Sequence, residues 1–392
     1  MLTLGCASRV RLELTHDDPS GQTLAAVVDS EAARRLLVDL LARRSPDPRL
    51  AALAPGLLDE AVNDLSPGPR ADLGRPPDQE QLRELGQQVS IDFAALAFAR
   101  AIGADERSRA VQEVFDRALQ DGPARSQEMM RRPGGFPYTV LFAPAWLYRS
   151  HPEVGADFAR QRLLLDRLGI AHRLIPTPES GSVEDNAAAI AAAVRDAGRD
   201  GRPLILVSTS KSGAEVALAL SRLLGPEETA SVAGWLNAGG ALAGTPLADA
   251  ALRPPVSWFT RAVLWFAGWN PAGLVSLTTG PSRMRLEGAR VPDSVAVVNL
   301  VAVPVSGSIG RRLSGSYRIL RHHGPNDGVV LLADAIWPGG ANIVALGSDH
   351  LFTPLQEDGP ALALLRAVDA AVGVHRAWSS PAAAPAALRT DE

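Results

Sequence analysis

Short apolar runs alternate with amphipathic stretches over the last two thirds of the chain. Between the early runs, apolar positions recur at helical spacing over 155–168, from Ser182 onward and over 211–224. The runs themselves, each bounded by polar or turn-forming residues, occupy 138–143, 171–175, 203–207, 232–237, 295–303 and 343–346. Because strands that alternate with crossover helices form parallel sheets, this pattern predicts an α/β fold with a mostly parallel sheet.

The first 135 residues show only helical spacing. Patterns begin near Ser30, near residue 82 and near Asp105, and a segment rich in proline, glycine and aspartate, predicted as loop or short helix, covers 45–79. At the other end, 376–392 contains alanine, proline and serine without periodicity. We therefore predict an N-terminal helical extension over 1–135, a sheet domain over 136–375 and a disordered tail over 376–392.

Composition narrows the class of function. The 392 residues are 46% hydrophobic and 21% charged with a net charge of −4, which is typical of a globular chain and gives no electrostatic case for a nucleic-acid partner. No apolar run reaches the roughly 18 residues of a membrane-spanning helix. The single cysteine excludes a disulfide framework, and neither a metal-ligand cluster nor a dinucleotide fingerprint is present. No metal or cofactor is expected.

The N-terminal sequence bears on localisation. As written it carries no secretory signal, which predicts a cytoplasmic protein. Leu4, Gly5 and Cys6 are also similar to the end of a bacterial lipoprotein signal whose start would lie upstream of Met1. In that case the protein would be anchored in the cell envelope. The alternative for Cys6 is an ordinary thiol in a frayed terminus.

One buried run leads directly into a serine-rich turn and then a helix, over 204–213. This context is typical of a nucleophile elbow, with Ser210 in the central place and the backbone N–H of Lys211 placed as an oxyanion donor. The elbow usually has glycine two residues before and two after the nucleophile, where this chain has Ser208 and Ser212. A phosphate-binding loop is the alternative, but its Gly-x-x-x-x-Gly-Lys-Ser/Thr motif is absent.

A serine nucleophile needs a base and an orienting carboxylate. His350 lies just after the last apolar run, and Asp327 lies in the Gly-Pro-Asn-Asp-Gly turn at 324–328. We predict these two as base and acid, with Asp349 and Asp334 as the next candidates for the acid. A structural histidine and a simple Asp-Gly turn are the alternatives.

Because the candidate serine, aspartate and histidine follow one another in this order, the segment 136–374 resembles an α/β-hydrolase of the bacterial serine esterase and lipase kind. The resemblance implies hydrolysis of carboxylic esters of apolar acids, with a small-molecule or lipid ester as substrate. It also implies a second oxyanion N–H in the loop after an early strand, often His-Gly-x; here the loop is Pro-Ala-Trp at 144–146, and the Trp146 N–H is the candidate. A thioesterase, a polyester depolymerase and an acyltransferase use the same triad, and a non-catalytic binding protein with this fold is the alternative from another class.

An apolar insertion occupies about 250–287. It carries Trp258, Trp265 and Trp269, with Arg261 as the only charge between the first and the last of them. In the resembling lipases an inserted helix here is a cap or lid that lines an acyl pocket or meets lipid. The resemblance therefore implies a substrate-binding lid and contact with a membrane surface, and a buried packing helix is the alternative.

Overall fold

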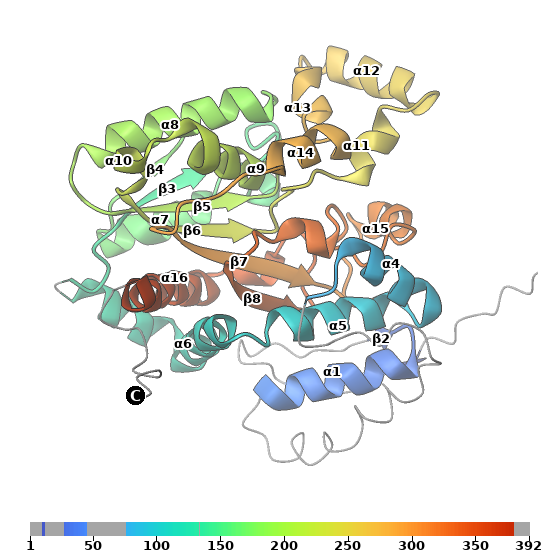
Figure 1. Ribbon diagram of the computed structural model, residues 1–392, viewed down its shortest axis with the longest axis horizontal. Coiled ribbons are helices and arrows are strands. Elements are labelled where there is room, and N and C mark those ends of the chain that lie inside the picture. The colour runs from blue at the N-terminus through green and yellow to red at the C-terminus, as the bar shows by residue number, and fades with distance from the viewer. Residues whose placement is uncertain (1–9, 12–26, 45–75, 133, 380–392) are drawn as a thin grey trace, which may run out of the picture.

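A six-stranded parallel sheet forms the centre of the protein (Figure 1). The computed structural model describes residues 10–11, 27–44, 76–132 and 134–379, so Cys6, most of 45–79 and the chain from 380 lie outside the described residues. The strands lie in the order β4-β3-β5-β6-β7-β8, and all neighbouring pairs are parallel. Their bounds are β3 (Thr139–Ala143), β4 (His172–Leu174), β5 (Leu204–Thr209), β6 (Val232–Ala238), β7 (Ala296–Val303) and β8 (Ala341–Leu346).

The first and last residues of each strand lie within two residues of the ends of a predicted apolar run. The predicted fold class is therefore confirmed. Apart from the edge strand β4, the strands are buried on both faces, which is why they read as continuous apolar runs. Outside this sheet, the two-residue strands β1 (Val10–Arg11) and β2 (Val27–Val28) pair antiparallel.

Helices cover both faces of the sheet. One face packs against α6 (Glu106–Arg131), α7 (Ala159–Leu168) and α16 (Asp358–Ser379). The opposite face packs against α8 (Val183–Gly198) and α9 (Lys211–Leu218), and beside them α5 (Ile91–Ile102). Two further helices, α1 (Glu31–Arg44) and α4 (Gln79–Gln88), lie against α5.

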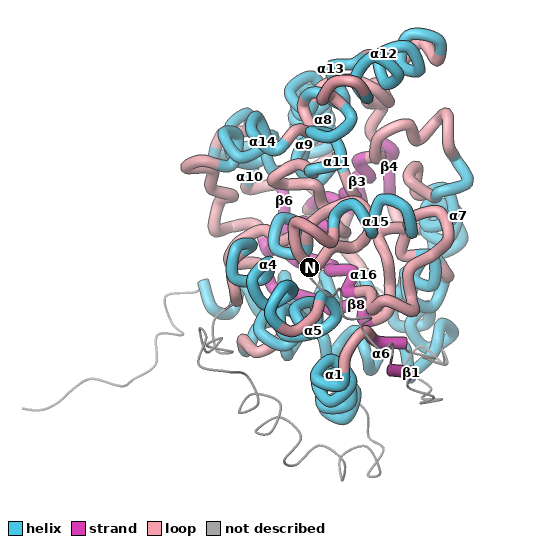
Figure 2. Tube along the Cα trace, turned by 90° about the vertical axis from the view of Figure 1, so that its right-hand side faces the viewer, coloured by secondary structure: helices cyan, strands magenta, loops and turns pink. Residues whose placement is uncertain are grey.

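The predicted cap segment folds into four short helices. These are α11 (Pro246–Ala251), α12 (Val256–Phe266), α13 (Pro271–Val275) and α14 (Thr279–Leu286). Helix α12 lies at the top rim of the molecule in both views (Figures 1 and 2). The remaining elements are the short helices α10 (Pro226–Thr229) and α15 (Ser314–Leu320), the 3-10 turns η1 (Pro152–Val154), η3 (Leu332–Ala335) and η4 (Thr353–Gln356), and the π-helical turn η2 (Ala219–Leu223) that follows α9.

The N-terminal helices share a core with the sheet. Phe98 and Ile102 of α5 pack against Val301 and Val344. At the edge strand β8, the backbone N–H of Asn342 donates to the buried Ser108 hydroxyl at 2.8 Å. The predicted extension is therefore part of the layers that hold the sheet. At the other end α16 continues to Ser379, so 376–379 is helical where the sequence predicts the start of the tail.

A buried carboxylate joins the N-terminal helices to the loop after β7. Asp92, fully buried at the start of α5, accepts the backbone N–H of Ser306 at 3.0 Å and that of Asp29 at 2.9 Å. Burial, and secondarily the charge of Asp29, raises the pKa of Asp92 to about 7. Burial also raises the pKa of Asp334 to about 6.

These raised pKa values predict the pH dependence of stability. The folded protein holds protons that the unfolded chain releases near pH 4, so this contribution is complete below about pH 4 and is lost as pH rises through about 7. The unfolding free energy is therefore expected to fall between about pH 4 and about pH 7, and Asp92→Asn should flatten the slope. Urea unfolding at several pH values measures it, with Asp334→Asn as the second variant. An unchanged slope in Asp92→Asn would contradict the assignment.

Candidate active site

Ser210 lies in a sharp turn between β5 and α9. Its backbone has φ 53° and ψ −124°, a left-handed φ that a residue with a side chain adopts at a cost in strain. The turn is held on both sides, because Ser210 N–H donates to Ala238 O at 3.2 Å and Ser210 O accepts the Ala241 N–H at 2.8 Å. The side chain is half-buried and lines a cavity that His350 also lines.

The two serines that replace the usual glycines are both fully buried. The hydroxyl of Ser208 accepts the indole N–H of Trp235 at 2.8 Å. The hydroxyl of Ser212 accepts the Thr209 N–H at 2.9 Å and donates to Ala143 O, at the end of β3, at 2.7 Å. Hydroxymethyl groups therefore fit these positions, and Ser212 ties the turn to the loop that follows β3.

The close approach that favours glycine occurs one residue later, at Gly213. A Cβ there would lie 2.6 Å from the Cα of Gly240. A side chain at this position would push α9 away from the loop after β6.

His350 and Asp327 form a buried pair beside the elbow. The His350 Nδ1 lies 2.7 Å from Asp327 Oδ2, and the side chains of the two are 7% and 2% exposed. Asp327 Oδ1 accepts the backbone N–H groups of Val329 and Val330 at 2.9 and 2.7 Å, which fixes the carboxylate. Since the carboxylate accepts, Nδ1 is the donor of this pair, and in a neutral imidazole the lone pair then lies on Nε2. Nε2 is buried and has no hydrogen-bond partner among the described residues.

Gly239 lies next to the His350–Asp327 pair and close in sequence to a residue that forms a hydrogen bond with Ser210. A Cβ on Gly239 would lie 3.5 Å from His350 Nδ1, and Gly239 directly follows Ala238, which accepts the Ser210 N–H. The structure therefore places Ser210 and the His350–Asp327 pair at the same carboxyl edge of the sheet, without a hydrogen bond between Ser210 Oγ and His350 Nε2.

Lys211 and Trp146 supply two backbone N–H groups at this edge. Lys211 is the first residue of α9, and Trp146 lines the same cavity as Ser210. Within the described part of the chain, neither N–H has a hydrogen-bond partner. A helix N-terminus and an unpaired amide are the groups that stabilise a developing oxyanion.

The Lys211 side chain takes part in an interaction that the sequence analysis missed. Its ammonium pairs with Glu215 Oε1 one helical turn later, and both side chains are 1% exposed. Asn186 on α8 donates to the same oxygen at 2.8 Å. Burial raises the pKa of Glu215 although Lys211 lowers it. The i,i+4 spacing was visible in the sequence, but burial of the pair was not.

The three predicted lid tryptophans do not line the cavity that contains Ser210. Trp258 and Trp265 lie on α12 with 71% and 75% of their surface exposed. Trp269 is half-buried and packs in the same cluster as Trp146 and Leu264. The part of the cap segment that lies beside the site is therefore the side that carries Leu264 and Trp269, which pack in the same cluster as Trp146.

Two further observations bear on the class of site. No group of three or more histidine, cysteine, aspartate or glutamate side chains suited to a metal ion is found among the described residues. Within the same residues, no helix is both long enough and apolar enough to cross a membrane.

No protein-family model and no curated protein matches this sequence. Among solved structures, the chain is similar to the metagenomic carboxyl esterase MGS0156, with 24% identity, a TM-score of 0.48 and coverage of 60% of this chain and 76% of that chain. It is similar to the mature Bacillus licheniformis lipase BlEst2 with 23% identity, a TM-score of 0.45 and coverage of 55% and 85%. It is also similar to the phospholipase PlaB from Legionella pneumophila, with 18% identity, a TM-score of 0.35 and coverage of 51% of this chain and 45% of that chain.

The fold assignment rests on this chain itself. Six parallel strands carry helices on both faces, and the strand–turn–helix unit at Ser210 lies at the carboxyl edge of the sheet. Asp327 and His350 follow in the loops before and after β8. With this architecture, the chain has the α/β-hydrolase fold.

Proposed function

We propose that the protein is a serine hydrolase that cleaves carboxylic esters of apolar acids through an acyl-enzyme. The observation that carries the proposal is the buried His350–Asp327 pair, joined at 2.7 Å, whose histidine lines the same cavity as a serine on a strained turn. A buried carboxylate orients the imidazole, and the other ring nitrogen, which has no hydrogen-bond partner among the described residues, is free to accept the serine proton, as general-base activation requires.

The mechanism follows from the roles of these groups. Ser210 Oγ attacks the ester carbonyl while His350 Nε2 takes its proton, and Asp327 stabilises the imidazolium. The N–H groups of Lys211 and Trp146 bind the oxyanion of the tetrahedral intermediate. The imidazolium then protonates the leaving alcohol, and water releases the acid from Ser210 by the same steps in reverse order.

Related acyl-transfer activities use the same intermediate. A thioesterase, a polyester depolymerase and an acyltransferase differ from an esterase in the leaving group or the acceptor, and a non-catalytic binding protein lacks turnover altogether. A fluorophosphonate reagent tests the proposal, because it labels only an activated serine. Labelling is expected in the wild type and not in Ser210→Ala, together with hydrolysis of nitrophenyl esters. Absence of both in the folded wild type would favour the binding protein.

The outer face of α12 favours contact with a lipid surface. Trp258, Phe259, Trp265 and Phe266 are between 71% and 81% exposed and follow one another at helical spacing, so they form one aromatic face. The helix contains a single charged residue, Arg261. A contiguous exposed aromatic face marks an interaction surface, and tryptophan is enriched where one end of a side chain meets lipid and the other meets water.

Vesicle binding measures this contact. Wild-type protein should sediment with phosphatidylcholine vesicles, and Trp265→Ala and Phe266→Ala should each weaken binding about tenfold or more, since burying an aromatic side chain contributes about 1.5–3 kcal/mol. Leu163→Ala on α7 is the control, because Leu163 is also exposed but lies on another helix. Equal binding by all four proteins would remove α12 as the lipid contact.

A further inference from the structure

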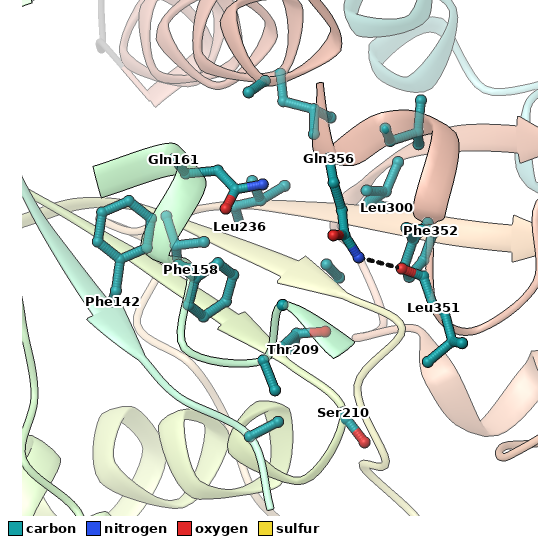
Figure 3. A pocket seen from close by; sticks show the side chains of 18 of the residues that line it. Phe142, Phe158, Gln161, Thr209, Ser210, Leu236, Leu300, Leu351, Phe352 and Gln356 are labelled. Atoms are coloured by element: carbon teal, nitrogen blue, oxygen red, sulfur yellow. Dashed lines mark hydrogen bonds between the residues drawn. The ribbon is translucent and has the colours of Figure 1, made fainter. Parts of the chain in front are cut away.

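The cavity at Ser210 extends into the core of the domain. Its volume is about 200 Å³, and its lining runs from Ser210 and His350 to residues of α7 and α16. Figure 3 shows Phe142, Phe158 and Leu300 around it, in the layer between the sheet and these two helices. The cavity therefore reaches behind the carboxyl edge of the sheet.

The strand register explains why the wall of the cavity is apolar. Phe142 of β3 pairs with Val207 of β5, and Val207 pairs with Leu236 of β6. Paired residues on neighbouring strands project from the same face of a sheet. That face is the one covered by α7 and α16, which add Leu164 and Leu364 to the lining.

Among the residues that the structure describes, no Asp, Glu, Lys or Arg side chain lines the cavity. Gln161 and Gln356 are the amide side chains in the lining, and Figure 3 shows both well away from Ser210. Gln356 Nε2 already donates to Leu351 O at 2.8 Å. A ligand portion that fills this space is therefore uncharged and mainly apolar.

We infer that the acyl chain of the ester lies in this core cavity, and that its volume of about 200 Å³ selects esters of a single medium-length acyl chain. The inference rests on the proposed function, because it takes Ser210 as the atom that bonds to the acyl carbon. It places the determinants of chain length in α16 and β7, at residues such as Leu364 and Leu300. The α12 tryptophans, which do not line the cavity, then have no part in chain-length selection.

The test is a series of nitrophenyl esters of increasing acyl length. In the wild type, kcat/KM should rise about fourfold for each methylene that enters the cavity, the rate equivalent of about 0.8 kcal/mol per buried methylene. Leu364→Ala should move the optimum to longer chains, and Ala361→Leu should lower the octanoate-to-acetate ratio at least tenfold. Both residues lie on α16 and line the cavity.

A matched control lies on the same helix. Leu362 is fully buried in the same core cluster but does not line the cavity, so Leu362→Ala should lower stability and leave the chain-length profile as in the wild type. Trp265→Ala should also keep the profile. If Leu364→Ala fails to fold, Ala361→Leu and the labelling rates of the wild type with alkyl fluorophosphonates of increasing length provide the same comparison.

The outcomes separate this inference from the proposed function. A profile that changes in Trp265→Ala and not in Leu364→Ala or Ala361→Leu places the chain under α12 and overturns the inference, while Ser210 labelling leaves the serine hydrolase in place. A wild type that prefers acetate outright also overturns it. Absence of Ser210 labelling and of hydrolysis for every ester instead removes the proposed function.

Discussion

Ester hydrolysis is expected to fall by about 10³-fold or more in each of Ser210→Ala, His350→Ala and Asp327→Asn, because the three residues would act as one unit. The asparagine variant is the most informative. Its Oδ1 still accepts the Val329 and Val330 N–H groups, but its NH₂ now faces His350 Nδ1. Nδ1 must then accept, so Nε2 carries the hydrogen and cannot take the serine proton.

Calorimetry on each variant shows whether it is folded, and kinetics on the folded variants then measure the loss of activity. The double variant Ser210→Ala, His350→Ala should be no less active than Ser210→Ala alone. Asp349→Asn is the control, because its carboxylate accepts the Gly310 N–H at 2.9 Å and lies in sequence directly beside His350. It should stay within a few-fold of the wild type. An inactive Asp349→Asn with an active Asp327→Asn would move the orienting role to Asp349.

The sheet could be predicted from the sequence because its strands, apart from the edge strand β4, are buried on both faces. Such strands read as unbroken apolar runs, and the polar turns between them mark their ends. The first residues of the helices were harder to predict from the sequence. The pattern predicts a helix from 155, but α7 begins at Ala159, since η1 and the left-handed Phe158, at φ 55°, redirect the chain there. That turn depends on contacts that periodicity does not encode.

The candidate site, like the fold, could be predicted from the sequence only in part. The residue types and their order predict Ser210, Asp327 and His350, and the structure brings them together because their loops share one sheet edge. The location of the cavity was not predicted. Helix α12 carries aromatic residues on one face and Ser257 and Leu264 on the other, and only the latter two are buried. The pattern defines two faces, but which of them packs inward depends on the partner surface.

A proline at position 211 is expected to lower kcat by about 10²–10³-fold relative to methionine at the same position, as for loss of one oxyanion donor. Both variants lose the ammonium that pairs with Glu215, and only proline also removes the backbone N–H. The first position of a helix tolerates proline well. Comparing Lys211→Pro with Lys211→Met therefore isolates the N–H from the ion pair.

Stability is measured alongside, because each variant leaves Glu215 buried without its cation. Breaking a buried pair on one side costs about 3–5 kcal/mol, and Glu215→Gln added to Lys211→Met should recover much of it, since the Asn186 amide can still donate to the side-chain oxygen at this position. Should Lys211→Pro fail to fold, Trp146→Pro removes the other N–H and should show a similar loss of kcat. If Lys211→Met combined with Glu215→Gln is folded yet as inactive as Lys211→Pro, the ammonium itself supports the reaction and the N–H is not the main contribution of Lys211.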